Sequence, residues 1–183
     1  MKVMKGLLLL LLVLLAVAAG CVQPASTQKT APGDNISYGP DNWRNIEVTD
    51  VTTGETFTLS DFSGQYLLIE TFAVWCPTCL SQQIEIAKMR QSSDDPALHF
   101  SLDVDPSEDE NRVREHLERY SFDWVFVVAP REMSQSLVDE FGVTIVNAPS
   151  APMILMCPDG SARLLRTGVK PAGELASEIE KGC

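Results

Sequence analysis

The chain has 183 residues, of which 45% are hydrophobic, and its formal net charge at neutral pH is −11. This length and composition suit one ordinary globular domain, and the sequence contains no internal repeat. The strong negative charge makes nucleic acid and anionic surfaces poor partners for it.

The first 20 residues have the composition of a secretory signal. Lys2 and Lys5 precede an uncharged apolar run from Leu7 to Ala19, and small residues lead into Cys21. The run is shorter than the roughly 20 residues of a membrane-spanning helix, and a simple N-terminal anchor helix is the alternative. The small residues before Cys21 resemble the lipobox of lipoproteins. That resemblance implies that Cys21 carries lipid and that the protein is extracytoplasmic and anchored to the cell membrane.

Residues 21–42 are rich in Pro, Ser, Thr, Gly and Asn and poor in large apolar side chains. Such a segment cannot bury enough surface to fold, so its composition predicts a flexible tether. Residues 43–183 are then expected to form the single folded domain, since no second linker interrupts them.

The domain is expected to begin with a β-hairpin at 45–62, around Thr53-Gly54. Strand and helix patterns alternate after it, with strands at 66–72, 98–105 and 124–129 and helices at 77–91, 107–120 and 131–142. Ser107 is the expected N-cap of the second helix. A hairpin of 152–157 and 162–168 and a helix at 171–182 follow. This alternation predicts an α/β fold with a mixed, mostly parallel sheet between layers of helices.

Cys76 and Cys79 lie between the strand at 66–72 and the helix that begins at Pro77. A structural disulfide between them would close so short a loop that it would remove little chain entropy. A cysteine at a helix N-terminus is stabilised as thiolate by unpaired N–H groups and by the helix dipole. The spacing therefore predicts a redox couple in which Cys76 is the nucleophile and Cys79 resolves the mixed disulfide.

A zinc site needs four ligands, usually with a second Cys or His pair beside the first. The remaining candidates do not form such a pair at ligand spacing; they are His99, His116, Cys157 and Cys183. The acidic cluster at 103–110 lacks the glycine and the final glutamate of a calcium loop, so its side chains are assigned to a strand end and a helix start. No metal and no cofactor are expected.

The sequence "WCPTC" after an apolar strand resembles the thioredoxin superfamily, and "TGETFTLSDFSGQYLLIETFAVWCPTC" is similar to its tethered TlpA-like, redoxin branch. The resemblance covers nearly all of 43–183, including the helix–strand–helix block at 107–142 that plain thioredoxin lacks. It implies a thioredoxin-like three-layer sandwich and a thiol–disulfide oxidoreductase that acts on protein disulfides. The implied partners are extracytoplasmic proteins with thiols or disulfides, and a membrane thiol-transfer protein as redox partner.

The resemblance also implies roles for four further residues. Trp75 matches the tryptophan before the first cysteine, and Glu70 lies where thioredoxins bury an acid. Burial would raise the pKa of Glu70, so that its carboxylate can take the proton of Cys79. Ala151-Pro152 matches the cis-proline segment that faces the disulfide and receives the substrate as an added strand.

Three structural alternatives stay open at this point. Trp75 is either a substrate-facing residue or an ordinary core or rim residue, and Pro149 competes with Pro152 for the cis position. Cys157 and Cys183 either form a structural disulfide or remain a buried thiol and a frayed terminus.

The main functional alternative is a non-enzymatic binding module in which Cys76 and Cys79 form a static disulfide. A peroxiredoxin-like peroxidase is a weaker one, because Ile69 and Ala73 replace the Pro and Thr upstream of that family's cysteine. Copper delivery of the Sco type needs a wider cysteine spacing and a distal histidine, which 134–160 lacks.

Overall fold

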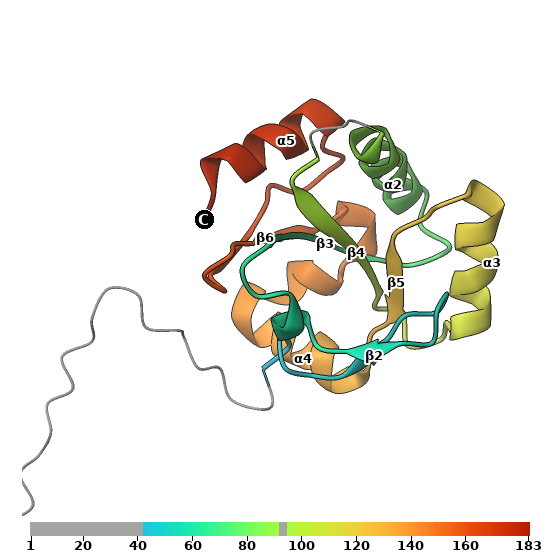
Figure 1. Cartoon of the computed structure of the whole chain (residues 1–183). Coiled ribbons are helices and arrows are strands. Elements are labelled where there is room, and N and C mark those ends of the chain that lie inside the picture. Colours follow the sequence, from blue (N-terminus) through green and yellow to red (C-terminus); the bar gives the residue numbers. More distant parts are fainter. Residues whose placement is uncertain (1–41, 92–94) are drawn as a thin grey trace, which may run out of the picture. The chain divides into compact units, whose positions relative to one another are not determined.

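The computed structural model describes residues 42–91 and 95–183. The predicted signal, Cys21 and, apart from Asn42, the predicted tether lie outside the described residues. A five-stranded sheet with the order β5-β4-β3-β6-β7 forms the centre of the domain (Figure 1).

The central strand β3 (Tyr66–Phe72) pairs in parallel with β4 (Ala97–Asp103), which pairs in parallel with β5 (Val125–Val128). On its other side β3 pairs antiparallel with β6 (Met153–Met156), which continues antiparallel to β7 (Ala162–Leu164). The mixed sheet confirms the predicted α/β fold. Because β3 is the central strand and both of its faces are covered, its sequence is apolar at successive positions.

The first hairpin forms a separate small sheet. Strand β1 (Val48–Thr49) pairs antiparallel with β2 (Thr56–Phe57). The turn between them uses Gly54 at φ +74°, a conformation that glycine adopts without steric cost. The 3₁₀ helix η1 (Leu59–Phe62) then leads toward β3.

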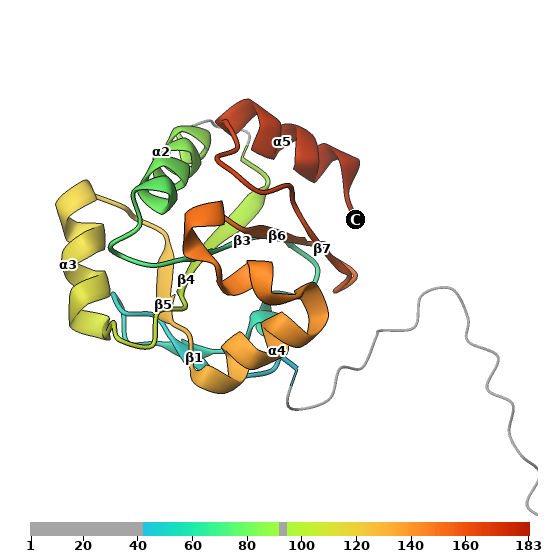
Figure 2. The ribbon, with the colours of Figure 1, turned by 180° about the vertical axis from the view of Figure 1, so that it is seen from behind.

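Helices cover both faces of the central sheet. Leu68 and Phe72 of β3 pack in one core cluster with side chains of α2 (Pro77–Arg90), α3 (Glu110–Tyr120) and α5 (Ala172–Lys181). Leu67 and Ile69 face the opposite cluster, which includes α4 (Arg131–Phe141). Figure 2 shows the same separation from behind, with α2 and α5 on one side and α4 on the other. Two short 3₁₀ helices, η2 (Val143–Val146) and η3 (Ala148–Ser150), link α4 to β6.

The start of α3 differs from the prediction. Its N-cap is Asp109, whose carboxylate accepts the Arg112 N–H at 2.9 Å. Ser107 was the expected cap, but its N–H and hydroxyl both donate to Oδ1 of Asp105. The serine is therefore used in the turn before the helix, and the next suitable acceptor caps it.

Cys157 and Cys183 form a disulfide in the structure, with their Cα atoms 6.0 Å apart. The bond joins the end of β6 to the end of the chain after α5, next to the turn at 158–160. Of the two alternatives that the sequence leaves open, the structure has the paired one. No helix within the described residues is long and apolar enough to cross a membrane.

Candidate active site

Cys76 and Cys79 lie where β3 gives way to α2. Cys76 is the N-cap of α2, and Pro77 occupies its first position, where a missing N–H costs no hydrogen bond. The N–H of Cys79 donates to Sγ of Cys76 at 3.2 Å. Both cysteines are free thiols in this structure. The helix N-terminus thus directs a donor at one sulfur of the pair, as the sequence predicts.

The second sulfur differs from the first in its hydrogen bond and not in its burial, because Cys76 is also buried, with 1% of its area exposed. The Cys79 thiol is fully buried and donates to the carbonyl oxygen of Ala148 at 3.2 Å. Burial raises the pKa of the Cys79 thiol well above its usual range, and Cys76 and Glu70 raise it further. Cys79 therefore holds its proton in the reduced protein, as a resolving thiol does before a base removes that proton.

Glu70 lies on β3, on the face of the sheet that α2 covers. Its carboxyl group is fully buried, and Oε2 accepts the Ser101 hydroxyl at 3.0 Å. Burial raises the pKa of Glu70 to about 8, although Ser101, Gln83 and Lys170 each lower it. Its Oε1 has no hydrogen-bond partner within the described part of the chain. Near neutral pH the group is therefore mostly protonated. Its carboxylate form, which grows as the pH rises toward about 8, can accept a proton and raises the pKa of the Cys79 thiol.

Trp75 lies at the surface with 54% of its area exposed, so it is a rim residue rather than a core residue. Its indole Nε1 donates to Oδ2 of Asp105 at 2.6 Å. The preceding N–H, of Val74, donates to Oε2 of Glu108 at 2.6 Å. Glu108 is 8% exposed and pairs with Arg112 at 2.9 Å. Two acids from the segment after β4 thus fix the backbone and side chain just before Cys76.

These two acids were missed as site residues, because the sequence assigns the cluster at 103–110 to a strand end and a helix start. Asp103 of that cluster is fully buried, and burial, with the neighbouring Glu108, raises its pKa to about 8. One feature of the sequence could have indicated that this cluster is more than a surface run. Asp103 is an acid at the end of an apolar strand, where both faces of the sheet are covered. No group of three metal-ligating side chains occurs among the described residues.

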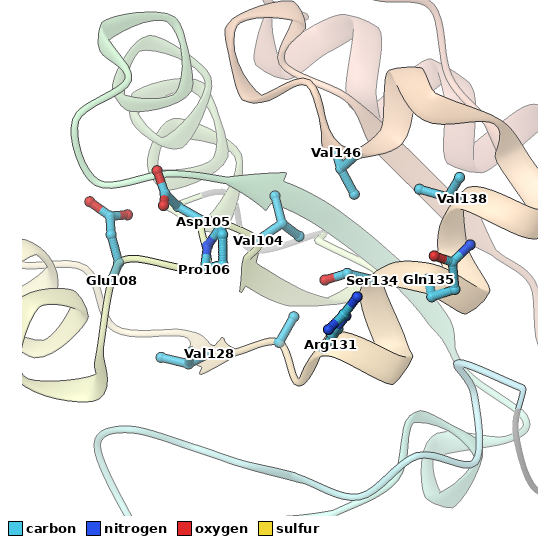
Figure 3. A pocket seen from close by; sticks show the side chains of 11 residues that line it. Val104, Asp105, Pro106, Glu108, Val128, Arg131, Ser134, Gln135, Val138 and Val146 are labelled. Carbon is cyan, nitrogen blue, oxygen red and sulfur yellow. The ribbon is translucent and has the colours of Figure 1, made fainter.

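A hollow of about 610 Å³ lies beside this acidic segment. Figure 3 shows valine side chains along it, with Asp105 and Glu108 at one end and Arg131, Ser134 and Gln135 of α4 at the other. Because Asp105 also holds Trp75, the hollow begins next to the exposed indole. Its lining is mainly apolar, and Asp105, which bonds the Trp75 indole, is part of it.

The Ala151–Pro152 segment differs from the expectation. The described residues contain no cis peptide bond, so the cis prediction for Pro152 is wrong, and so is its alternative at Pro149. Ala151 is fully buried with φ +44°. Its carbonyl accepts the Nζ of Lys170 at 2.9 Å, and its N–H donates to Ala148 O at 2.8 Å. Both backbone groups of Ala151 are therefore bonded inside the protein, because Lys170 holds the carbonyl inward.

The comparisons agree with this architecture. The Redoxin family model matches residues 32–161. No curated protein sequence matches the chain significantly. Among solved structures, DsbF of MTB in mixed oxidized and reduced forms superimposes with a TM-score of 0.60 at 16% identity, over 83% of this chain and 98% of that one.

Two further structures resemble the domain. BsSco, a Sco-family cytochrome c oxidase assembly protein with a disulfide switch, gives a TM-score of 0.61 at 17% identity, over 74% of this chain and 89% of that one. A secreted Mycobacterium tuberculosis disulfide oxidoreductase homologous to E. coli DsbE gives a TM-score of 0.56 at 13% identity. The match covers 76% of this chain and 97% of that one. At these identities the likeness establishes the fold, which is that of thioredoxin.

Proposed function

The chain belongs to the Redoxin family of thioredoxin-fold thiol–disulfide oxidoreductases, and we propose that Cys76 and Cys79 are the couple with which it exchanges disulfides with extracytoplasmic proteins. The observation that carries this proposal is the contrast between the two sulfurs. Sγ of Cys76 accepts a helix N-terminal N–H at 3.2 Å, whereas the Cys79 thiol donates to Ala148 O at 3.2 Å.

The exchange proceeds in two balanced steps. The Cys76 thiolate attacks one sulfur of a substrate disulfide, forms a mixed disulfide and releases the other substrate sulfur as a thiolate, which takes a proton. Cys79 then gives its proton to the Glu70 carboxylate and attacks Sγ of Cys76. The second substrate thiolate leaves, the protein keeps a Cys76–Cys79 disulfide, and two electrons have passed to the substrate. The same steps run in reverse when the protein delivers its disulfide.

The surface around Cys76 supports a protein substrate. The exposed indole of Trp75 and the apolar hollow beside Asp105 offer contacts for side chains that flank a substrate cysteine. In the proposal, Trp75 and Pro152 contact the substrate, and Ala151 serves by shaping the turn rather than by pairing with an added strand. That change follows from the internal bonds of the Ala151 backbone.

The location is part of the proposal. The lipobox-like residues before Cys21 support a lipid anchor and an extracytoplasmic domain, with a membrane thiol-transfer protein as redox partner. The DsbE-like Mycobacterium tuberculosis oxidoreductase is itself described as secreted, which agrees with such a location.

The reduction potential of the pair tests the function against a static disulfide. The measurement uses a double variant, Cys157→Ala with Cys183→Ala, equilibrated in glutathione and dithiothreitol redox buffers, so that only one pair titrates. A catalytic couple is expected above about −300 mV. A potential below that value indicates a structural disulfide and contradicts the proposal.

A further inference from the structure

Lys170 is a buried lysine in the loop between β7 and α5. Its side chain is fully inaccessible, and Nζ donates to the carbonyl oxygens of Ala151 at 2.9 Å, Arg166 at 3.1 Å and Gly168 at 2.7 Å. An ammonium group has three donors and no acceptor, so each of its N–H bonds has a partner here. Burying such a charge is costly unless it is fully hydrogen bonded. The three carbonyl acceptors therefore stabilise the charged ammonium form of Lys170.

The backbone of Lys170 is fixed to the redox helix. Its N–H donates to Oε1 of Gln82 at 2.7 Å, and its carbonyl accepts Nε2 of the same side chain at 3.1 Å. Gln82 is a fully buried residue of α2, one turn after Cys79. Lys170 thus connects α2 to the turn that carries Ala151.

A continuous line of hydrogen bonds leads from Lys170 to the resolving cysteine. The ammonium holds the Ala151 carbonyl, the Ala151 N–H donates to Ala148 O at 2.8 Å, and the same oxygen accepts the Cys79 thiol at 3.2 Å. Ala151 has φ +44°, a left-handed conformation that is unfavourable for a residue with a Cβ atom. Such a turn persists only where its surroundings hold it.

We propose that Lys170 is a positioning residue for Cys79, which acts by holding the Ala148–Ala151 turn so that the Ala148 carbonyl faces the resolving thiol. The inference rests on the proposed redox role of Cys79. It gives a purpose to a buried charge that lies in a loop outside the Cys76–Cys79 motif.

The charge of Lys170 has a second, separable effect. It lowers the pKa of Glu70, against the larger effect of burial, as do the hydrogen bonds of Ser101 and Gln83. The pKa of Lys170 is itself lowered to about 8. Burial is the largest cause and Arg166 acts in the same direction, whereas Glu70 and Glu174 act against them. Removing the ammonium should therefore raise the pKa of Glu70, which a purely structural role for Lys170 would not do.

The test compares four variants of the full chain. Lys170→Met removes the charge and the donors, Lys170→Gln removes the charge but keeps a donor, and Lys170→Arg keeps the charge. Lys181→Met is the control, because Lys181 is an exposed lysine of α5 paired with Glu178 at 2.6 Å. Two quantities are measured: the titration of the Glu70 carboxyl carbon by NMR in the reduced protein, and the rate at which Cys79 resolves a Cys76–glutathione mixed disulfide.

In Lys170→Met we expect the Glu70 midpoint to rise and resolution to slow about tenfold. Lys170→Gln should shift the midpoint similarly with a smaller loss of rate, Lys170→Arg should restore both, and Lys181→Met should change neither. An unchanged midpoint and rate in Lys170→Met overturn the inference, as does an equal loss in Lys170→Arg.

Folding defects are also decisive. If Lys170→Met does not fold, Lys170→Gln is measured in its place, and an unchanged rate of resolution there overturns the inference. If neither neutral variant folds, Lys170→Arg decides: a folded protein with parental values supports a required charge, and an unfolded one shows that Lys170 serves packing alone. The Glu70 titration needs no turnover, so it reports on Lys170 even if the parent protein exchanges no disulfide and the proposed function fails.

Discussion

The amide N–H of Cys79 donates to Sγ of Cys76 across 3.2 Å. This contact places a donor of the α2 N-terminus at the sulfur that we propose as the nucleophile. A donor at the helix N-terminus favours negative charge on Cys76. Cys79, one helical turn deeper, instead donates a hydrogen bond to Ala148 O and keeps its proton. The two thiols of one short motif are thus made unequal by the backbone around them.

The first prediction concerns the order in which the two thiols react. With iodoacetamide near neutral pH, Cys76 of the reduced protein should be alkylated at least about ten times faster than Cys79, because only the thiolate reacts and the pKa of Cys79 is strongly raised. Quenched samples analysed by peptide mass spectrometry give both rates. Equal rates would remove the assignment of Cys76 as nucleophile.

The second prediction concerns the pH dependence of stability. Folding raises the pKa of Glu70 from 4.5 to about 8, so between these values the folded chain holds a proton that the unfolded chain has lost. The free energy of unfolding should be highest below about pH 4.5 as far as this group is concerned, and should fall as the pH rises through about 8. Glu70→Gln, which cannot ionise, should lack this loss and be the more stable protein at pH 9.

Urea denaturation of both proteins from pH 5 to 9 shows whether the free energy of unfolding falls as the pH rises. The kinetics of disulfide exchange test the role of Glu70 as proton acceptor. Because Glu70→Gln removes the proton acceptor, resolution by Cys79 should slow about 100-fold above about pH 8, where Glu70 of the parent protein is mostly a carboxylate. Parallel stability curves for the two proteins, together with unchanged exchange, would mean that Glu70 has neither the raised pKa nor the role.

The third prediction concerns the disulfide between Cys157 and Cys183. It closes a loop of 26 residues, and the chain-entropy account gives about 3 kcal/mol for a loop of this size. The double variant Cys157→Ala with Cys183→Ala should lose about that free energy of unfolding in urea and keep its exchange activity, since the bond lies away from the redox pair. Loss of activity in a folded double variant would contradict the structural role.

The fourth prediction concerns the acid beneath the loop before Cys76. Glu108→Ala leaves the partly buried N–H of Val74 without its acceptor, which should cost about 1 kcal/mol of stability and slow attack by Cys76. Glu108→Gln keeps a side-chain oxygen for that N–H and should recover most of both. Glu115→Ala, on the exposed face of α3, is the matched control and should behave as the parent.

The fifth prediction concerns the anchor. Cys21→Ser removes the sulfur that would carry lipid, so the variant should leave the membrane fraction or keep its signal uncleaved. Cell fractionation with mass measurement of the mature N-terminus distinguishes these outcomes. A variant that is processed and partitions like the parent would exclude Cys21 as the lipidation site.

Much of the fold could be predicted because the relevant signals are local. The apolar stretch at 66–72 has the same bounds as β3, and Pro77 marks the first residue of α2. The cap of α3 was misplaced by two residues, because Ser107 and Asp109 are both good caps and only the tertiary turn with Asp105 decides between them.

The contacts that shape the site are long-range, and the sequence gives little sign of them. Glu108 meets Val74 across 34 residues, and Gln82 meets Lys170 across 88. A lone lysine in a loop and a glutamate in an acidic run are ordinary surface residues by composition. The Lys170 contact with the Ala151 carbonyl belongs to the same class, because it cannot be read from the residues around Pro152.

Trapping of the mixed disulfide is the most direct measurement of the central claim, that Cys76 attacks and Cys79 resolves. A Cys79→Ser variant of the full chain, expressed in its own compartment and analysed by non-reducing electrophoresis and mass spectrometry, should accumulate disulfides that join Cys76 to cysteines of other extracytoplasmic proteins. Cys76→Ser should accumulate none, since the Cys79 thiol, whose pKa is strongly raised, stays protonated and does not initiate exchange. Absence of Cys76-linked species from Cys79→Ser, or equal trapping by the two variants, would contradict the account.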